Sequence, residues 1–334
     1  MEKFERLTEL MSRQKILLAD LALDDIEQRI SKLDPEQLSS DVEEAIGKFR
    51  SNDAMKAIRS DAQKVRKMIR EAQTKDPNWI LSSEDNSRRM KSFHRVNNDS
   101  SIICFKVEAR SIQCNVFNLL ALFIEVDLLP AILSTPLASL DIDPLLMLKF
   151  RKLMHIVCTP IWPFSARDIT LDMSGFDVLD QKCVVLCGES FEKADDVGIS
   201  APESPSKSTR ISAQLSGVIL RPLGENLTSM VVIAALDVKL GAIPPALVQF
   251  ITKRLTLPIF QMFTRHAEKL SESQIHQERL SEDRFGVYET IRNALSDYDY
   301  EQSRIAEGEA SSQLEDVESS KISFSHPSNH LATI

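Results

Sequence analysis

Apolar and polar side chains alternate with a period of two in several segments, and this pattern most constrains the fold. Ile169, Leu171 and Met173 alternate with polar residues directly after the proline-containing stretch PIWPFSARDI (160–169). Prolines at positions 160 and 163 exclude a helix there and favour an extended turn. Because a period of two is typical of a strand with one buried face, the sequence predicts a rigid turn that leads into a half-buried strand.

Comparable patterns predict the rest of a sheet. The expected strands cover residues 88–96, 103–107, 145–158, 167–173, 182–191, 210–221 and 230–240, with a Ser/Pro-rich loop at 200–208. In the segment from residue 210, Ile211, Ala213 and Leu215 share one face. Residues 115–133 are apolar enough for a buried helix or helix pair that Pro130 breaks.

A long amphipathic helix is predicted from residue 245 to about residue 269, a length of ~37 Å at 1.5 Å per residue. Its apolar stripe follows helical spacing through Val248, Ile251, Leu255, Ile259 and Met262. We expect Pro258 to kink this helix, which would leave Phe260 and Phe263 free to meet a bilayer.

The ends of the chain differ from the middle. Residues 1–75 read as a helical N-terminal extension, in which one helix carries the stripe Ile58, Ala62, Val65, Ile69 and Ala72. The other faces of this helix are basic. This pattern is typical either of a helix that lies on a membrane surface or of a solvated face opposite a packing stripe, and we favour the second interpretation. Residues 76–270 form the predicted core domain, and residues 271–334 an acidic, partly disordered tail. The predicted fold class is α+β.

Charge and composition exclude several classes of function. The net charge is −9, and residues 271–334 hold 5 basic and 13 acidic side chains, a balance of −8 (5 − 13). The nearly neutral remainder lacks the basic face that a nucleic-acid-binding protein needs. A charged N-terminus and the absence of a long apolar stretch predict a cytoplasmic protein, with peripheral contact at membranes as a possibility.

The sequence offers little chemistry for catalysis. Cys183 and Cys187 are expected to be buried thiols, since as neighbours on a strand face they are too far apart for one zinc ion. His155 lies in an apolar strand and reads as a satisfied core histidine. Asp168 and Asp172 share a strand face as either a carboxylate pair or a solvated alternation. We therefore expect no metal, no cofactor and no enzymatic activity.

Four segments carry a resemblance to a known family. PFSARDITL, CVVLCGES, STRISAQLSGVILRPL and MVVIAALDVKLGAIPPALVQF resemble, in this order, the second half of START (steroidogenic acute regulatory protein-related lipid transfer) domains. The matching motifs are Arg167-Asp168, Arg221-Pro222-Leu223, and Asp237 followed by Gly241, Ile243 and Pro244. The resemblance spans about residues 79–270. It implies a helix-grip fold, in which a curved antiparallel sheet wraps a C-terminal helix and encloses a tunnel for one lipid.

The resemblance also implies which residues form the site. The expected lipid-binding residues are Met154, Ile169, Leu171, Met173, Ile211, Ala213, Leu215, Val232, Ala234, Leu236, Val248, Ile251, Leu255 and Met262. Gly241, Pro244 and Pro258 are the expected hinge of a gate formed by the C-terminal helix.

One position departs from the family pattern. Many members have a cavity arginine where this chain has Met173, paired with an acid on the preceding strand, and a gapless register puts Met154 opposite. Both halves of the charge pair are then missing together, which predicts an apolar, methionine-lined pocket.

These observations predict a non-catalytic, intracellular lipid-binding or lipid-transfer protein. Its expected partners are a phospholipid or sterol-like ligand and, transiently, a membrane surface. One alternative is a lipid-sensing interaction protein that binds a protein partner through residues 1–75. Another is an enzyme on the helix-grip fold that acts on a hydrophobic substrate.

Overall fold

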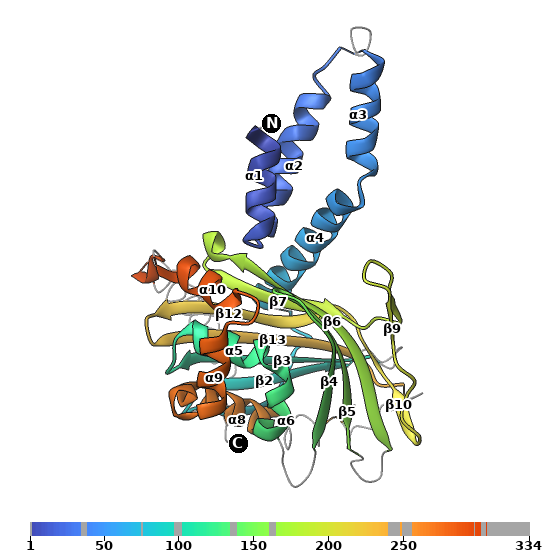
Figure 1. Cartoon of the computed structure of the whole chain (residues 1–334). Helices are drawn as coiled ribbons and strands as arrows, with labels where there is room; N and C mark the ends of the chain where they lie inside the picture. The colour runs from blue at the N-terminus through green and yellow to red at the C-terminus, as the bar shows by residue number, and fades with distance from the viewer. Residues whose placement is uncertain are drawn as a thin grey trace, which may run out of the picture.

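One large sheet organises the molecule (Figure 1). The computed structural model describes residues 2–34, 39–74, 76–96, 102–133, 139–159, 165–239, 248, 256–296, 298–301 and 305. Its strands are β1 Ile80–Asp85, β2 Met90–Val96, β3 Ile102–Ile112, β4 Leu140–Met147, β5 Arg151–Cys158, β6 Ala166–Val178, β7 Cys183–Glu189, β8 Lys193–Ala194, β9 Ile199–Ser200, β10 Ser208–Arg210, β11 Ser212–Ala213, β12 Ser216–Gly224 and β13 Leu227–Asp237.

The sheet is antiparallel along its main path. Neighbouring strands follow the order β1-β2-β3-β13-β12-β7-β6-β5-β4, with β11 beside β13. The short strand β10 pairs with β6 in parallel, and β8 and β9 form a separate small hairpin. The predicted strands at 88–96, 182–191 and 230–240 are present as β2, β7 and β13.

Helices cover both faces of the sheet (Figure 1). The described part of the chain contains α1 Glu2–Ser12, α2 Ile16–Ile30, α3 Ser40–Ser51, α4 Asp53–Gln73, α5 Val116–Ile124, α6 Leu129–Leu133, α8 Leu257–Glu268, α9 Gln274–Glu282 and α10 Val287–Ser296. We call the face that carries α5, α8 and α10 the inner face, and the face that carries α1, α2 and α4 the outer face.

The main core lies on the inner face. Buried side chains of α5, α8 and α10 pack there against β3, β12 and β13. Phe263 of α8 contacts Phe123 of α5, with ring centroids 4.7 Å apart. Tyr288 of α10 is 1% exposed, and its ring lies 5.7 Å from that of Phe117. Burial of aromatic side chains on this scale makes these helices a large contributor to stability.

A second core joins the N-terminal helices to the outer face. Ile58, Ala62 and Val65 of α4 are buried against β6, β7, β12 and β13, together with side chains of α1 and α2. The predicted packing stripe of this helix is therefore confirmed. Its basic side chains are partly ion-paired, since Arg59 and Arg66 both reach Asp20 of α2. The end of α2 and all of α3 project away from the sheet (Figure 1).

Two glycines permit a close approach of strands in the middle of the sheet. A Cβ atom at Gly188 of β7 would lie 1.8 Å from the backbone oxygen of Asp172, and one at Gly217 of β12 would lie 2.1 Å from that of Leu186. No real side chain tolerates such distances, so β6, β7 and β12 can only pass each other here because both residues are glycine.

The structure corrects several predicted boundaries. Residues 145–158 are not one strand, because a turn at 148–150 separates β4 from β5. Residues 210–221 are likewise divided among β10, β11 and β12. The apolar segment 115–133 breaks at Glu125, not at Pro130. Pro130 is the second residue of α6, a position where the missing N–H costs no hydrogen bond.

The predicted tail also needs correction. We expected an acidic extension from residue 271, but α9 and α10 fold onto the domain, and Val287 and Tyr288 belong to the inner-face core. Tyr288 donates a hydrogen bond of 2.5 Å to Glu125, which is buried at the end of α5. The folded unit therefore continues at least to Ser296.

Candidate functional site

Apolar side chains gather on the inner face of β4, β5 and β6. In the β5–β6 register, Met154 pairs with Leu171 and Ile156 pairs with Ile169. Met154, Leu171 and Met173 form a cluster with Ile142 of β4 and Val126, which follows α5. Of the predicted lipid-binding residues, Met154, Ile169, Leu171 and Met173 thus share one surface, and Leu171 and Met173 remain half-buried.

Strand β13 extends this apolar surface. Val232 packs against the inner-face core, and Ala234 and Leu236 follow it on the same face at a period of two. Ala213 of β11 pairs with Leu236 and is buried. Ile211 lies between β10 and β11, where its N–H donates to the backbone oxygen of Asp168.

Leu215 was predicted on this surface, and that prediction is wrong. Its side chain packs against the outer-face core, next to the N-terminal helices. The period of two fails because residues 214 and 215 leave the strand between β11 and β12. A local departure of two residues is enough to reverse the facing of a side chain.

The C-terminal helix is described only in part. Gly241, Pro244, Ile251 and Leu255 lie outside the described residues, so their predicted roles stay predictions. Val248 is buried. Pro258 is the second residue of α8, so the predicted kink at this position also remains untested.

The buried face of α8 differs from the predicted stripe. Leu257, Phe263 and Ala267 are buried, whereas Met262 is only half-buried and lies outside the inner-face core. Phe263 is buried against Phe123, and Phe260 also packs on the core. The expectation that these two phenylalanines meet a bilayer is therefore wrong for this conformation. The buried stripe is displaced by one residue from the predicted one, and one residue in a helix turns the side-chain direction by about 100°.

The residue opposite Met173 was misassigned by the gapless register. Lys152, not Met154, pairs with Met173, because β5 and β6 are offset by two residues from the expected alignment. An even offset leaves the faces unchanged, so Met154 stays on the inner face and Lys152 joins it. The period-two relation between positions 152 and 154 could have revealed this lysine from the sequence.

Charged side chains lie near Lys152 at the end of α5. Arg279 of α9 holds Glu125 (Nη1–Oε2 3.4 Å) and Asp127 (Nη2–Oδ2 2.9 Å). Burial lowers the pKa of Lys152, although the negative charges of Glu125 and Asp127 act in the opposite direction. In the described residues, the inner face therefore combines an extended apolar surface with the buried cation of Lys152.

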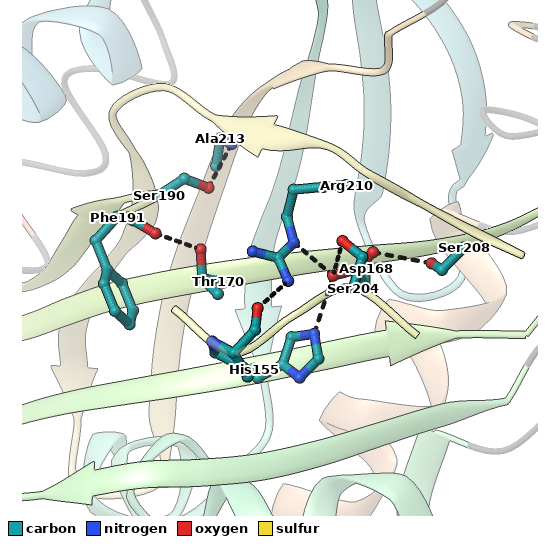
Figure 2. Close-up of polar contacts among 10 residues, drawn as sticks. His155, Asp168, Thr170, Ser190, Phe191, Ser204, Ser208, Arg210 and Ala213 are labelled. Carbon is teal, nitrogen blue, oxygen red and sulfur yellow. Dashed lines mark hydrogen bonds and ion pairs between the residues drawn. The ribbon is translucent and has the colours of Figure 1, made fainter. Parts of the chain in front are cut away.

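The outer face carries a buried polar cluster around Asp168 (Figure 2). The Asp168 side chain is fully buried and accepts hydrogen bonds from His155 Nε2 (3.0 Å), Ser204 Oγ (3.2 Å), Ser208 Oγ (2.9 Å) and Arg210 Nε (2.5 Å). These donors tie β5 and the segment 204–210 to β6. His155 is thus a hydrogen-bonded core histidine, as predicted. The alternative that Asp168 is a solvent-exposed residue of an alternating strand is wrong, because its side chain is buried.

The same cluster argues against nucleophilic catalysis at this point. Burial raises the pKa of Asp168, but the hydrogen bonds from His155, Arg210 and Ser208 outweigh it and lower the pKa below its ordinary value. Ser204 donates to Asp168 and not to His155, so the serine–histidine–carboxylate order of a catalytic triad is not formed. The arrangement stabilises the fold of the loop that follows β9.

No group of three or more His, Cys, Asp or Glu side chains in the described part of the chain could hold a metal ion. None of its helices is by itself long and apolar enough to cross a bilayer. The segments Val116–Ile124 and Val126–Leu133 meet those criteria only together, and they are bent by 80°.

Comparisons with known proteins agree with the architecture. No family model and no curated protein matches the sequence. Among solved structures, human STARD10 is 12% identical with a TM-score of 0.50, and the match covers 66% of this chain and 86% of that one. Human StAR-related lipid transfer protein 5 is 15% identical with a TM-score of 0.50, over 66% of this chain and all of that one (100%). The curved antiparallel sheet with its packed helices is therefore a START-like domain of the helix-grip α+β fold.

Proposed function

We propose that this protein binds one lipid against the inner face of its sheet and carries it between membranes without changing it chemically. The observation that supports this most is the row of half-buried apolar side chains on β5, β6 and β13. Folded proteins normally cover such surfaces, since each Å² of apolar area left in water costs about 25 cal/mol. A lipid chain would remove that area from water.

The fold supports the same proposal at a coarser level. One of the similar structures bears the name of a lipid transfer protein, and its similarity to this chain concerns the fold. The ligand in our proposal is a membrane lipid, and loading and delivery take place at a membrane surface from the cytoplasm. The proposal includes no catalytic step.

A substitution that fills the inner face tests the proposal. Leu171→Trp adds a bulky ring to the half-buried apolar surface on β6 and should block lipid uptake from vesicles. Leu148→Trp makes the same exchange at an exposed position in the β4–β5 turn and is the matched control. Transfer of fluorescent lipid between donor and acceptor liposomes should fall at least ~10-fold in the first variant only. Equal transfer by both variants and the unsubstituted protein would exclude the inner face as the site.

A second candidate function is protein binding through the N-terminal helices. The ends of α2 and α3 enclose a cleft of about 420 Å³ lined in part by Ile30, Leu33 and Ile46. Leu33 is 44% exposed there, and Val42 of α3 is 40% exposed. Deletion of residues 1–75 is a poor test, because it would uncover the outer-face core. Replacing Leu33 and Val42 with serine leaves that core intact. Loss of a co-purifying protein with lipid transfer unchanged would favour this function.

A further inference from the structure

Lys152 is a buried cation on the inner face of the sheet. Its side chain is 8% exposed and shares the face of Met154 on β5. Across the strands it pairs with Met147 of β4 and Met173 of β6. Methionine side chains offer an ammonium group no ionic partner, so the strand neighbours do not compensate its burial.

The ammonium group has no direct partner in the described part of the protein. No hydrogen bond or ion pair joins it to any described residue. The two acids whose charge it feels are bound by Arg279, and Tyr288 also donates to Glu125, whereas Asp127 Oδ1 is buried without a hydrogen-bond partner and makes no contact with Lys152. Their attraction does not offset the loss of water around Lys152, as the direction of its pKa shift indicates.

An unpartnered buried charge is unfavourable unless a ligand completes it. We propose that Lys152 binds the anionic oxygen of a lipid head group, either phosphoryl or carboxyl, while the lipid chain lies along Met154, Leu171 and Met173. This inference rests on the proposed function and adds the chemical class of the ligand. A neutral sterol would leave the ammonium group without its counter-charge, so the site favours an acidic lipid.

The geometry also explains why an acid of the protein does not take this place. Arg279 of α9 binds both Asp127 and Glu125, and Tyr288 fixes Glu125 from α10. In this proposal the ligand oxygen approaches Lys152 from the apolar side, next to its strand neighbour Met173. One positive charge on an otherwise apolar surface then orients the lipid with its head group near α9 and its chain along β5 and β6.

Lipid competition with the full chain tests this inference. Phosphatidylcholine vesicles that contain phosphatidylglycerol, oleic acid and cholesterol in equal minor amounts are incubated with the protein. The protein is then separated, and its lipid is measured by mass spectrometry. We expect at least ~10-fold enrichment of phosphatidylglycerol or oleic acid over cholesterol, which has no anionic oxygen, whereas phosphatidylcholine carries a phosphoryl oxygen of its own. Enrichment of only one of them identifies the phosphoryl or the carboxyl group as the ligand.

The variants Lys152→Met and Lys152→Gln remove the charge, and Lys67→Met, on the exposed side of α4, is the control. The first two should lose the enrichment while they still take up phosphatidylcholine or cholesterol, and their apo forms should melt no lower than the unsubstituted protein. Retained enrichment in both Lys152 variants, or no enrichment in the unsubstituted protein, would overturn the inference. Failure of the unsubstituted protein to take up any lipid would instead overturn the proposed function.

Discussion

Removal of the Asp168 carboxylate should be among the most destabilising single changes on the outer face. Asp168→Ala leaves four hydrogen-bond donors without their acceptor, including the Arg210 guanidinium and the buried His155. Removing one partner of a buried ion pair costs about 3–5 kcal/mol. Arg210 keeps its bond to the Pro202 carbonyl oxygen at 2.8 Å, which limits but does not prevent this loss.

The matched control, Asp172, lies four residues further along β6 on the same face of the strand. Asp172 binds Arg151 through both carboxylate oxygens at 2.8 and 2.6 Å, but these side chains are 25% and 24% exposed. Water can replace such a pair, and Arg151 keeps Asp196 as a partner, so Asp172→Ala should cost only about 1 kcal/mol.

Equilibrium unfolding in urea, followed by tryptophan fluorescence, measures both losses. With a slope near 2 kcal/mol/M, Asp168→Ala should lower the midpoint by about 2 M and Asp172→Ala by about 0.5 M. The Asp168 pKa is lowered below 3.8 in the folded state, so its contribution is present above that pH and is lost as the pH falls through the lowered pKa. The difference between Asp168→Ala and the unsubstituted protein should therefore shrink below about pH 3.8. Equal losses for the two variants at neutral pH would refute the reasoning.

Three further predictions follow from the packing of the inner face. A chain that ends at Leu270 lacks Tyr288 and should lose at least ~3 kcal/mol relative to one that ends at residue 305, as measured by thermal unfolding; equal stabilities would show that α10 is dispensable. Met173→Arg brings a second cation opposite Lys152 and should lower the free energy of unfolding by ~3–5 kcal/mol, whereas Met173→Leu should lower it by less than ~1.5 kcal/mol. An arginine variant as stable as the unsubstituted protein would contradict the β5–β6 register. Burial lowers the pKa values of His266 and His276, whose ring centroids lie 5.1 Å apart. Because protonation of these rings is less favourable in the folded state, stability should fall as the pH drops below 6.5. His276→Gln should weaken this dependence in thermal melts between pH 7 and pH 5.

Strands that form short continuous apolar runs could be predicted from the sequence. The segments that became β7 and β13 were located within a few residues, because each is an apolar run that packs on both faces of the sheet. The β4–β5 hairpin was missed because its turn, Leu148–Lys149–Phe150, contains neither glycine nor proline. The facing of Leu215 failed for a related reason, since nothing in the local sequence marks the interruption between β11 and β12.

The candidate site was predicted in part, for a physical reason. Periodicity identifies which residues share a strand face, and this placed Met154, Leu171 and Met173 together correctly. Periodicity does not determine the register between strands, which depends on the turns that join them. Lys152 therefore escaped notice. The buried Asp168 escaped because its partners at positions 204, 208 and 210 come from a loop that folds back over the sheet.

Native mass spectrometry of the full chain purified from cells, with extraction of its bound material, tests the central claim most directly. We expect a complex of one chain with one lipid, and an extracted lipid that is chemically identical to one present in the membranes of the host. Addition of liposomes should exchange that lipid without a new product. A chain that carries no lipid and acquires none from liposomes, or that converts the lipid to another compound, would contradict the account.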